Sequence, residues 1–166
     1  AGLVRETALI LRRVAPGVRI VLGGPEIVAA CAASWVGIAD ALVVGEGESA
    51  FRALCAEALA GGRLAAADGA PRLVQGGAED VAALELPYDG YDAEDLARRI
   101  LYVESSRGCP HGCAYCTSRR TPLRLFDPER LGASFDALIA RGARSFRFLD
   151  RSFNADEKHA CAVLAF

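Results

Sequence analysis

Three cysteines lie within eight positions of the stretch SSRGCPHGCAYC, residues 105–116, at Cys109, Cys113 and Cys116. Their spacing is C-x3-C-x2-C. Thiolate ligands select zinc, iron–sulfur clusters or Cu(I) over hard cations such as magnesium and calcium. The stretch therefore predicts a metal site built from three thiolates that are close together in the chain.

The sequence shows no obvious fourth ligand for these thiolates. A structural zinc site has four ligands. His111 is a poor candidate for the fourth, because it lies between the first two cysteines on a loop too short to wrap back easily to the metal. Cys161 is remote in the sequence and lies in an apolar helical pattern. A [4Fe–4S] cluster normally takes four cysteines, and with three it leaves one iron free for an exogenous ligand that can receive an electron directly. We favour the three-thiolate cluster, and zinc stays open as the alternative.

Two glycine-rich stretches form a second candidate site. LGGPE at 22–26 and VVGEGE at 43–48 each follow an apolar, β-branched run. Because the carboxyl ends of parallel strands share one edge of a sheet, these loops are expected to flank one ligand crevice. The second stretch lacks the third glycine of a dinucleotide-binding fingerprint. The glycines alone support a ligand site and simple tight turns before helices about equally.

Strands and helices alternate along the chain, which predicts an α/β fold with right-handed βαβ units and parallel sheets. Phe51, Leu54, Cys55, Ala58 and Leu59 are expected to form the buried face of one helix, and Leu131, Phe135, Leu138 and Ile139 that of another. The expected elements are a helix at 5–14, a strand at 18–25, a helix at 26–34, a strand from 41, a helix at 48–60, a short strand near 73–74, a strand at 100–106, a helix from 127, a strand at 144–150 and a helix from about 155.

Composition excludes several classes of function. The 166 residues are 52% hydrophobic and 24% charged, with a net charge of −2 and no basic block, so nothing indicates nucleic acid or an anionic membrane surface as a partner. No apolar run has the length of a bilayer span, and no signal peptide is evident. The six cysteines, three of them clustered, favour metal binding in a reducing cytoplasm over disulfides. The absence of Met predicts an internal piece of a longer protein.

The cysteine stretch resembles the signature loop of the radical SAM enzymes. The spacing Cys109-x3-Cys113-x2-Cys116, the aromatic Tyr115 before the third cysteine and the preceding strand all match. The resemblance implies that the three cysteines hold a [4Fe–4S] cluster, whose open iron binds S-adenosylmethionine for reductive cleavage. It also implies that Tyr115 lines the adenine side. The loop would stand at the carboxyl end of the first strand of a partial (β/α) barrel, where barrel enzymes keep their chemistry.

Asp150 is expected beside this loop, because it ends the neighbouring parallel strand. Many radical SAM proteins have a Gly-Gly-Glu stretch there that binds the SAM amino group, whereas this chain has FLDRSFN at 148–154. That departure resembles the radical SAM proteins that carry a cobalamin-binding domain, and it implies that Asp150 contacts SAM. The alternative is a strand-end carboxylate that caps the next helix.

The first half of the chain resembles the second half of a B12-binding domain. The resemblance rests on LGGPE followed about twenty residues later by VVGEGE. It implies that Gly23 and Gly24, together with the loop Gly45, Glu46, Gly47 and Glu48, line the pocket for the cobalamin nucleotide tail. An empty flavodoxin-like scaffold domain is the rival interpretation.

The expected architecture is thus a partial Rossmann/flavodoxin-like cobalamin-binding domain at 1–62, a linker at 63–99 and the first βα units of a TIM-type radical SAM barrel at 100–166. The expected function is that of a cobalamin-dependent radical SAM enzyme, used for methyl transfer or another radical modification. A small molecule or another, unknown substrate and a reductant such as flavodoxin or ferredoxin are the implied partners. This piece alone is not expected to turn over, and the rival class is a non-enzymatic zinc-binding interaction module.

The remaining candidates are expected to be structural. Cys31, Cys55 and Cys161 fall in Ala-rich helical stretches and are expected to be small core residues. Trp35 is expected to pack at a helix end, and His159 to be exposed on the last helix.

Overall fold

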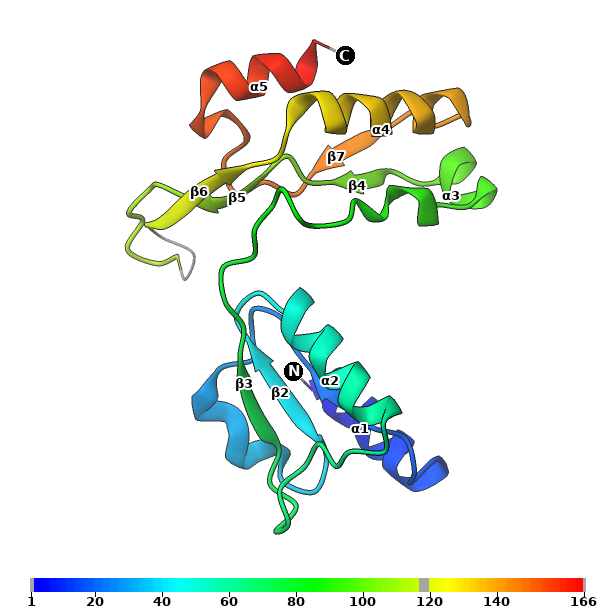
Figure 1. The fold of residues 1–166 in the computed structure, drawn as a ribbon, viewed down its shortest axis with the longest axis vertical. Helices are drawn as coiled ribbons and strands as arrows, with labels where there is room; N and C mark the ends of the chain where they lie inside the picture. Colours follow the sequence, from blue (N-terminus) through cyan, green and yellow to red (C-terminus); the bar gives the residue numbers. More distant parts are fainter. Residues whose placement is uncertain (1, 117–119, 166) are drawn as a thin grey trace. The chain divides into compact units, whose positions relative to one another are not determined.

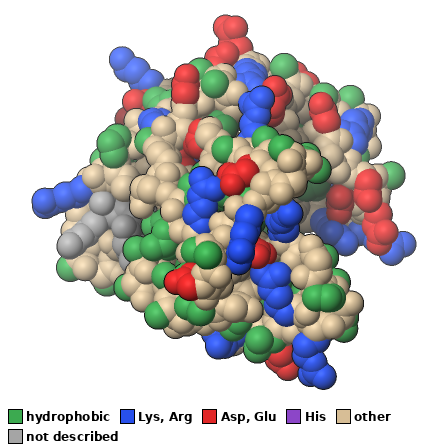
Figure 2. Space-filling model, turned by 60° about the horizontal axis from the view of Figure 1, so that its bottom comes forward, with side chains coloured by type: hydrophobic (Ala, Val, Ile, Leu, Met, Phe, Trp, Pro, Cys, Tyr) green, Lys and Arg blue, Asp and Glu red, His purple; other side chains and the backbone are tan. Residues whose placement is uncertain are grey.

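The computed structural model describes residues 2–116 and 120–165. The chain divides into two compact units, Ala1–Glu79 and Asp80–Phe166. The segment expected to be a linker, 63–99, is therefore shared between the two units. Acidic and basic side chains are interspersed on the face drawn in Figure 2. Within the described ranges, no helix is both long and apolar enough to cross a membrane.

The first unit is built on a parallel sheet with strand order β1-β2-β3 (Figure 1). The short strand expected near residues 73–74 is confirmed as β3. The elements of this unit are α1 (Gly2–Val14), β1 (Val21–Leu22), the 3-10 helix η1 (Ala29–Trp35), β2 (Ala41–Val44), α2 (Glu48–Leu59) and β3 (Arg72–Gln75).

The two faces of this sheet are covered by different helices. Successive side chains along a strand point to opposite faces, so neighbouring residues of β2 contact different helices. Leu42 faces a cluster that contains Ala8 of α1 and Trp35 of η1. Val43 faces the opposite cluster, which contains Leu54 of α2. Leu42 is fully buried and Val43 is 3% exposed. The sheet is therefore sandwiched between two layers, and the expectation that Trp35 packs at a helix end is confirmed.

Two expectations for the first unit need correction. The strand expected at 18–25 is only two residues long, because side chains satisfy the backbone before it: Arg12 donates to Val18 O at 2.9 Å, and Ile20 N donates to the Asp40 carboxylate at 2.7 Å. The expected apolar face of α2 is also too wide. Phe51 is 53% exposed and Leu59 90% exposed. The narrow sheet is covered by Leu54, with Ala50 and Ala58 of α2 packed beside it.

The second unit contains a parallel strand pair and an antiparallel hairpin. Figure 1 shows α4 lying along the β4–β7 pair, with α5 beside α4. The elements are η2 (Pro87–Gly90), α3 (Ala93–Arg98), β4 (Leu101–Val103), β5 (Ser106–Cys109), β6 (Thr121–Leu125), α4 (Pro128–Ala140), β7 (Phe146–Phe148), η3 (Phe153–Ala155) and α5 (Glu157–Leu164).

Helix α4 forms where the sequence predicts it. Asp127 caps the first turn of α4, since its carboxylate accepts from Glu129 N at 3.2 Å. Pro128 stands in the same turn, where a backbone N–H would have no partner within the helix, so its missing N–H costs no hydrogen bond. The expected face is buried at Leu131, Phe135 and Leu138, whereas Ile139 is 52% exposed.

Both units are α/β with parallel strands, which confirms the α/β part of the predicted fold class. The first unit is consistent with a Rossmann-like domain. In the second unit, β4 and β7 pair over three positions, and the described residues do not form a barrel. The expected strand at 100–106 is in fact two strands, β4 and β5, because the chain leaves the β4–β7 pair after Val103 and enters the hairpin.

Candidate functional site

The three clustered cysteines lie on the β5–β6 hairpin. Cys109 ends β5 and is 8% exposed, and its backbone N donates to Thr121 Oγ1 at 2.8 Å. Cys113 is exposed and Cys116 half-buried, and Cys116 N donates to Cys113 O at 3.2 Å. Cys109 thus belongs to the β5–β6 strand pair, whereas Cys113 and Cys116 lie on the loop that connects the two strands.

A glycine sets the shape of the hairpin just before the first cysteine. Gly108 has a φ of +95°, and the pairing register of β5 and β6 shifts between Arg107 and Cys109. A Cβ atom on Gly108 would stand 2.0 Å from Pro122 O. Only glycine fits this close approach between the strands.

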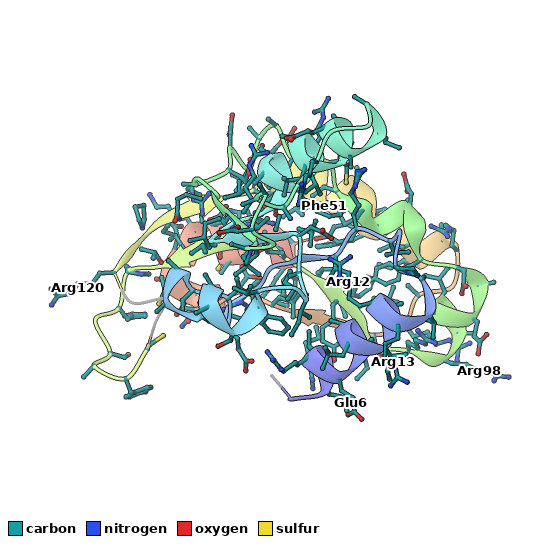
Figure 3. The ribbon with its side chains drawn as sticks, turned by 90° about the horizontal axis from the view of Figure 1, so that it is seen from below. Glu6, Arg12, Arg13, Phe51, Arg98 and Arg120 are labelled. Carbon is teal, nitrogen blue, oxygen red and sulfur yellow. The ribbon has the colours of Figure 1, made fainter. Side chains whose placement is uncertain are left out.

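The end of the cysteine loop is hydrogen-bonded to its beginning. Arg120 N donates to His111 O at 2.9 Å, and the Arg120 side chain points outward (Figure 3). His111 Nε2 lies 3.3 Å from Ser152 Oγ.

No group of three or more His, Cys, Asp or Glu side chains is arranged to hold a metal ion in the described part of the chain. The chemistry of three thiols suits an iron–sulfur cluster, and the role of these cysteines as ligands stays a prediction. All three cysteines are free of disulfides and stand on one hairpin. Tyr115, expected on the adenine side, is 92% exposed on this loop.

Asp150 lies beside the strand that leads to Cys109, as the parallel register predicts. Its Oδ1 accepts from Ser105 Oγ at 2.7 Å and from Ser106 Oγ at 2.5 Å, and its Oδ2 accepts from Ser105 N at 3.0 Å. The alternative in which Asp150 caps the next helix is wrong, because Asp156 caps α5 by accepting from His159 N at 2.9 Å. Contact of Asp150 with SAM stays a prediction.

The expectation that His159 is exposed is wrong. His159 is 7% exposed, and its Nε2 lies 3.0 Å from Ser105 O. Its partner is 54 positions away in the sequence. The polar residues around it, Glu157 and Lys158, make α5 look like a solvated helix, so no local pattern indicates this burial.

The expected core roles of the other cysteines are met only in part. Cys31 and Cys55 are half-buried, whereas Cys161 is exposed on α5.

Two tyrosine hydroxyls occupy the edge of β4 that faces away from β7. Tyr88 Oη accepts from Glu104 N at 2.9 Å and lies 3.3 Å from Glu104 O. Tyr91 Oη accepts from Tyr102 N at 3.1 Å and donates to Tyr102 O at 2.8 Å. Each phenol thus both accepts from and donates to the backbone, as a neighbouring strand would.

Tyr88 gives this arrangement a pH dependence. Burial raises the pKa of Tyr88 above its ordinary value of 10.0 and outweighs the hydrogen bond with the Glu104 backbone, which lowers it. The folded chain therefore keeps a proton that the unfolded chain loses, and the free energy of unfolding falls as pH rises through and above about 10.0. We expect Tyr88→Phe to flatten this alkaline decline in denaturant titrations, and to lower stability at neutral pH by about 1 kcal/mol through lost hydrogen bonds. Equal slopes in Tyr88→Phe and the parent would refute the assignment.

The first glycine stretch of the N-terminal unit borders a cavity. Gly23 follows β1 and lines a cavity of about 320 Å³ together with Leu22, Pro25, Ile27 and Trp35. Gly24 has a φ of +102°, which turns the chain away from the strand. The carboxyl end of β1 therefore opens onto a largely apolar hollow.

The second glycine stretch is held by a segment that sequence reasoning missed. Gly76 approaches it so closely that a Cβ there would lie 1.7 Å from Glu46 O. Glu46 Oε2 accepts from Glu79 N at 3.0 Å, and the Glu79 carboxylate accepts from Ser49 N at 2.9 Å and Ser49 Oγ at 2.6 Å. Residues 76–79 therefore fasten the loop to the first turn of α2. Gly76-Gly77 is the one sequence signal that could have indicated this approach.

A second cavity of about 270 Å³ lies at the opposite end of the sheet. Arg12 lines it and donates to Ile38 O at 2.8 Å and to Asp40 Oδ2 at 2.5 Å. Figure 3 shows Arg12 and Arg13 leaving α1 on different sides. Arg12 thus stabilises the loops that precede the strands.

No protein-family model matches the chain. The chain is 31% identical over 176 aligned positions to 2-(S-pantetheinyl)-carbapenam-3-carboxylate methyltransferase of Streptantibioticus cattleyicolor. The aligned region covers 89% of this chain and 25% of that methyltransferase. The chain thus spans about a quarter of the length of this curated relative, and it is a distant homologue of that part.

Proposed function

We propose that this chain is part of a cobalamin-dependent radical SAM enzyme that transfers a methyl group. The observation that carries the proposal is the hairpin with Cys109, Cys113 and Cys116, which follows β4 and is fastened to the end of β7 through Asp150. The homology to a methyltransferase supports methyl transfer over other radical modifications.

The three thiols are the proposed ligands of a [4Fe–4S] cluster. Cys109 would provide a ligand fixed by the strand pair, and Cys113 and Cys116 ligands on the loop. When bound, the cluster supplies an electron for the reductive cleavage of SAM at its open iron. The role of the chain is to hold these thiols, to orient SAM and to exclude water, since the cofactor carries the difficult chemistry.

The N-terminal unit is the proposed cobalamin-binding part. Gly23 lines a cavity of about 320 Å³ at the carboxyl end of β1, the sheet edge at which α/β proteins bind their ligands. The loop from Gly45 to Glu48 ends the neighbouring strand β2. Both stretches thus stand at one edge of this sheet, which supports a shared ligand there.

Anaerobic reconstitution of the full chain with iron and sulfide tests the cluster. We expect a brown protein that holds iron and sulfide in the amounts of one [4Fe–4S] cluster per chain. A colourless protein with stoichiometric zinc would overturn the proposal in favour of a zinc module.

Cobalamin binding is measured separately on the same protein. We expect hydroxocobalamin to co-purify through gel filtration and to change its visible spectrum on binding. Cluster formation without retained cobalamin would leave a radical SAM enzyme with an empty scaffold domain, and would overturn the cobalamin part alone.

A further inference from the structure

Ser105 is the most deeply buried polar residue at the start of the cysteine hairpin. It is 0% exposed, and Ser106 beside it is 4% exposed. Ser105 lies between β4 and β5 and belongs to neither strand. It is therefore the point at which the chain passes from the β4–β7 pair into the hairpin.

Three other elements converge on this serine. Asp150, after β7, accepts from Ser105 N at 3.0 Å and from Ser105 Oγ at 2.7 Å. Ser105 O accepts from Phe126 N, after β6, at 3.0 Å, and from His159 Nε2 of α5 at 3.0 Å. We call Ser105, Ser106, Asp150 and His159 the polar clasp.

The polar clasp contributes less net stability than apolar packing of the same size would. Burying two hydroxyls and an imidazole, and half-burying a carboxylate, costs desolvation that their mutual hydrogen bonds only offset, whereas apolar residues of the same size pack without that cost. What such a fully paired network provides is a single orientation of the backbone groups it holds. Here those groups lie four residues before Cys109.

We propose that Asp150 and His159 are positioning residues which, through Ser105 and Ser106, fix the orientation of the hairpin that carries Cys109. This rests on the proposed function in one respect, that the thiols so positioned are cluster ligands. Asp150 acts on the hydroxyls and one backbone N–H. His159 acts on the carbonyl oxygen by donating from Nε2.

The test uses His159→Leu and His159→Gln in the full chain. Leucine removes the donor to Ser105 O, whereas the glutamine amide keeps an N–H at nearly the position of Nε2. The readout, taken before any reconstitution, is the alkylation rate of Cys109 relative to that of the exposed Cys113. We expect His159→Leu to raise this ratio about tenfold through local opening of the hairpin, and His159→Gln to restore most of the parent value.

Val163→Ala is the matched control for general destabilisation. Val163 lies on the same helix, is 3% exposed and belongs to the apolar cluster of this unit, and its aliphatic side chain makes none of the hydrogen bonds of the clasp. We expect it to lower the unfolding midpoint without changing the alkylation ratio. A ratio that stays at the parent value in His159→Leu, or that rises as much in Val163→Ala, would overturn the proposal.

Asp150→Asn keeps the test decisive if His159→Leu fails to fold. The amide has one oxygen in place of two, so it cannot accept from Ser105 N and from both hydroxyls. We expect the same rise in the ratio, and an unchanged ratio would refute the clasp.

Failure of the clasp and failure of the proposed function are distinguishable. A parent protein that takes up no iron contradicts the proposed function, while the alkylation ratios still decide on the clasp. In a reconstituted protein, the EPR spectrum of the reduced cluster is expected to change in His159→Leu and to return in His159→Gln.

Discussion

Cys113→Ala is expected to abolish the iron–sulfur cluster of the full chain. Cys113 is exposed on the hairpin loop, so its removal leaves no core cavity and the fold should persist. Even the loss of an outer-shell partner lowers metal affinity by about 10–100-fold, so the loss of one of three ligands should lower iron retention by at least about tenfold. Iron and sulfide analysis after reconstitution, together with the visible spectrum, measures the effect.

Cys161→Ala provides the matched control. Cys161 is also an exposed free cysteine, but it lies on α5, outside the hairpin. We expect the parent content of iron and sulfide in this variant. If both variants lose iron equally, or if Cys113→Ala keeps its full complement, the assignment of the hairpin thiols as ligands is wrong.

Gly108→Ala is expected to disrupt the same site through the backbone. A side chain at a φ of +95° is strained, and the added Cβ would stand 2.0 Å from Pro122 O on the partner strand. Backbone strain of this kind costs about 1–3 kcal/mol, and the clash adds to it because neither strand can yield without breaking their pairing. We expect a fall in the free energy of unfolding of at least this size, measured in denaturant, and a loss of iron because Cys109 is displaced.

Gly112→Ala separates this effect from a general sensitivity of the loop. The nearest atom to a Cβ at Gly112 would be Arg120 Nε at 3.0 Å, and this flexible side chain can move aside. Stability and iron content should stay close to those of the parent. A benign Gly108→Ala would mean that the hairpin does not hold Cys109 as described.

Local signals in the sequence predict much of the fold. Asp127-Pro128-Glu129 indicates the start of α4 and Gly142 its end, because caps and breakers act within one turn of the residues they affect. The apolar runs that become β2 and β7 are recognised in the same way. The placement of Asp150 beside the cysteine strand follows from parallel topology, and the hydrogen bonds to Ser105 and Ser106 confirm it.

The parts that the sequence did not predict depend on distant partners. The β5–β6 hairpin consists of SRGC and TPLRL, which show little alternation, and its pairing spans a loop rich in turn residues. His159 is buried because a carbonyl oxygen 54 positions away accepts from it. Glu79 holds Ser49 across 30 positions. None of these contacts leaves a periodic pattern in the chain.

The hydroxyls of Tyr88 and Tyr91 protect one edge of β4 from pairing with another strand. Leu101 and Val103 direct their backbone groups to the segment around β7, so those of Tyr102 and Glu104 point to the other edge. There Tyr91 and Tyr88 already satisfy them. A strand arriving at this edge would have to displace both hydroxyls before it could pair with β4, whereas the bare edge of an ordinary strand invites such pairing.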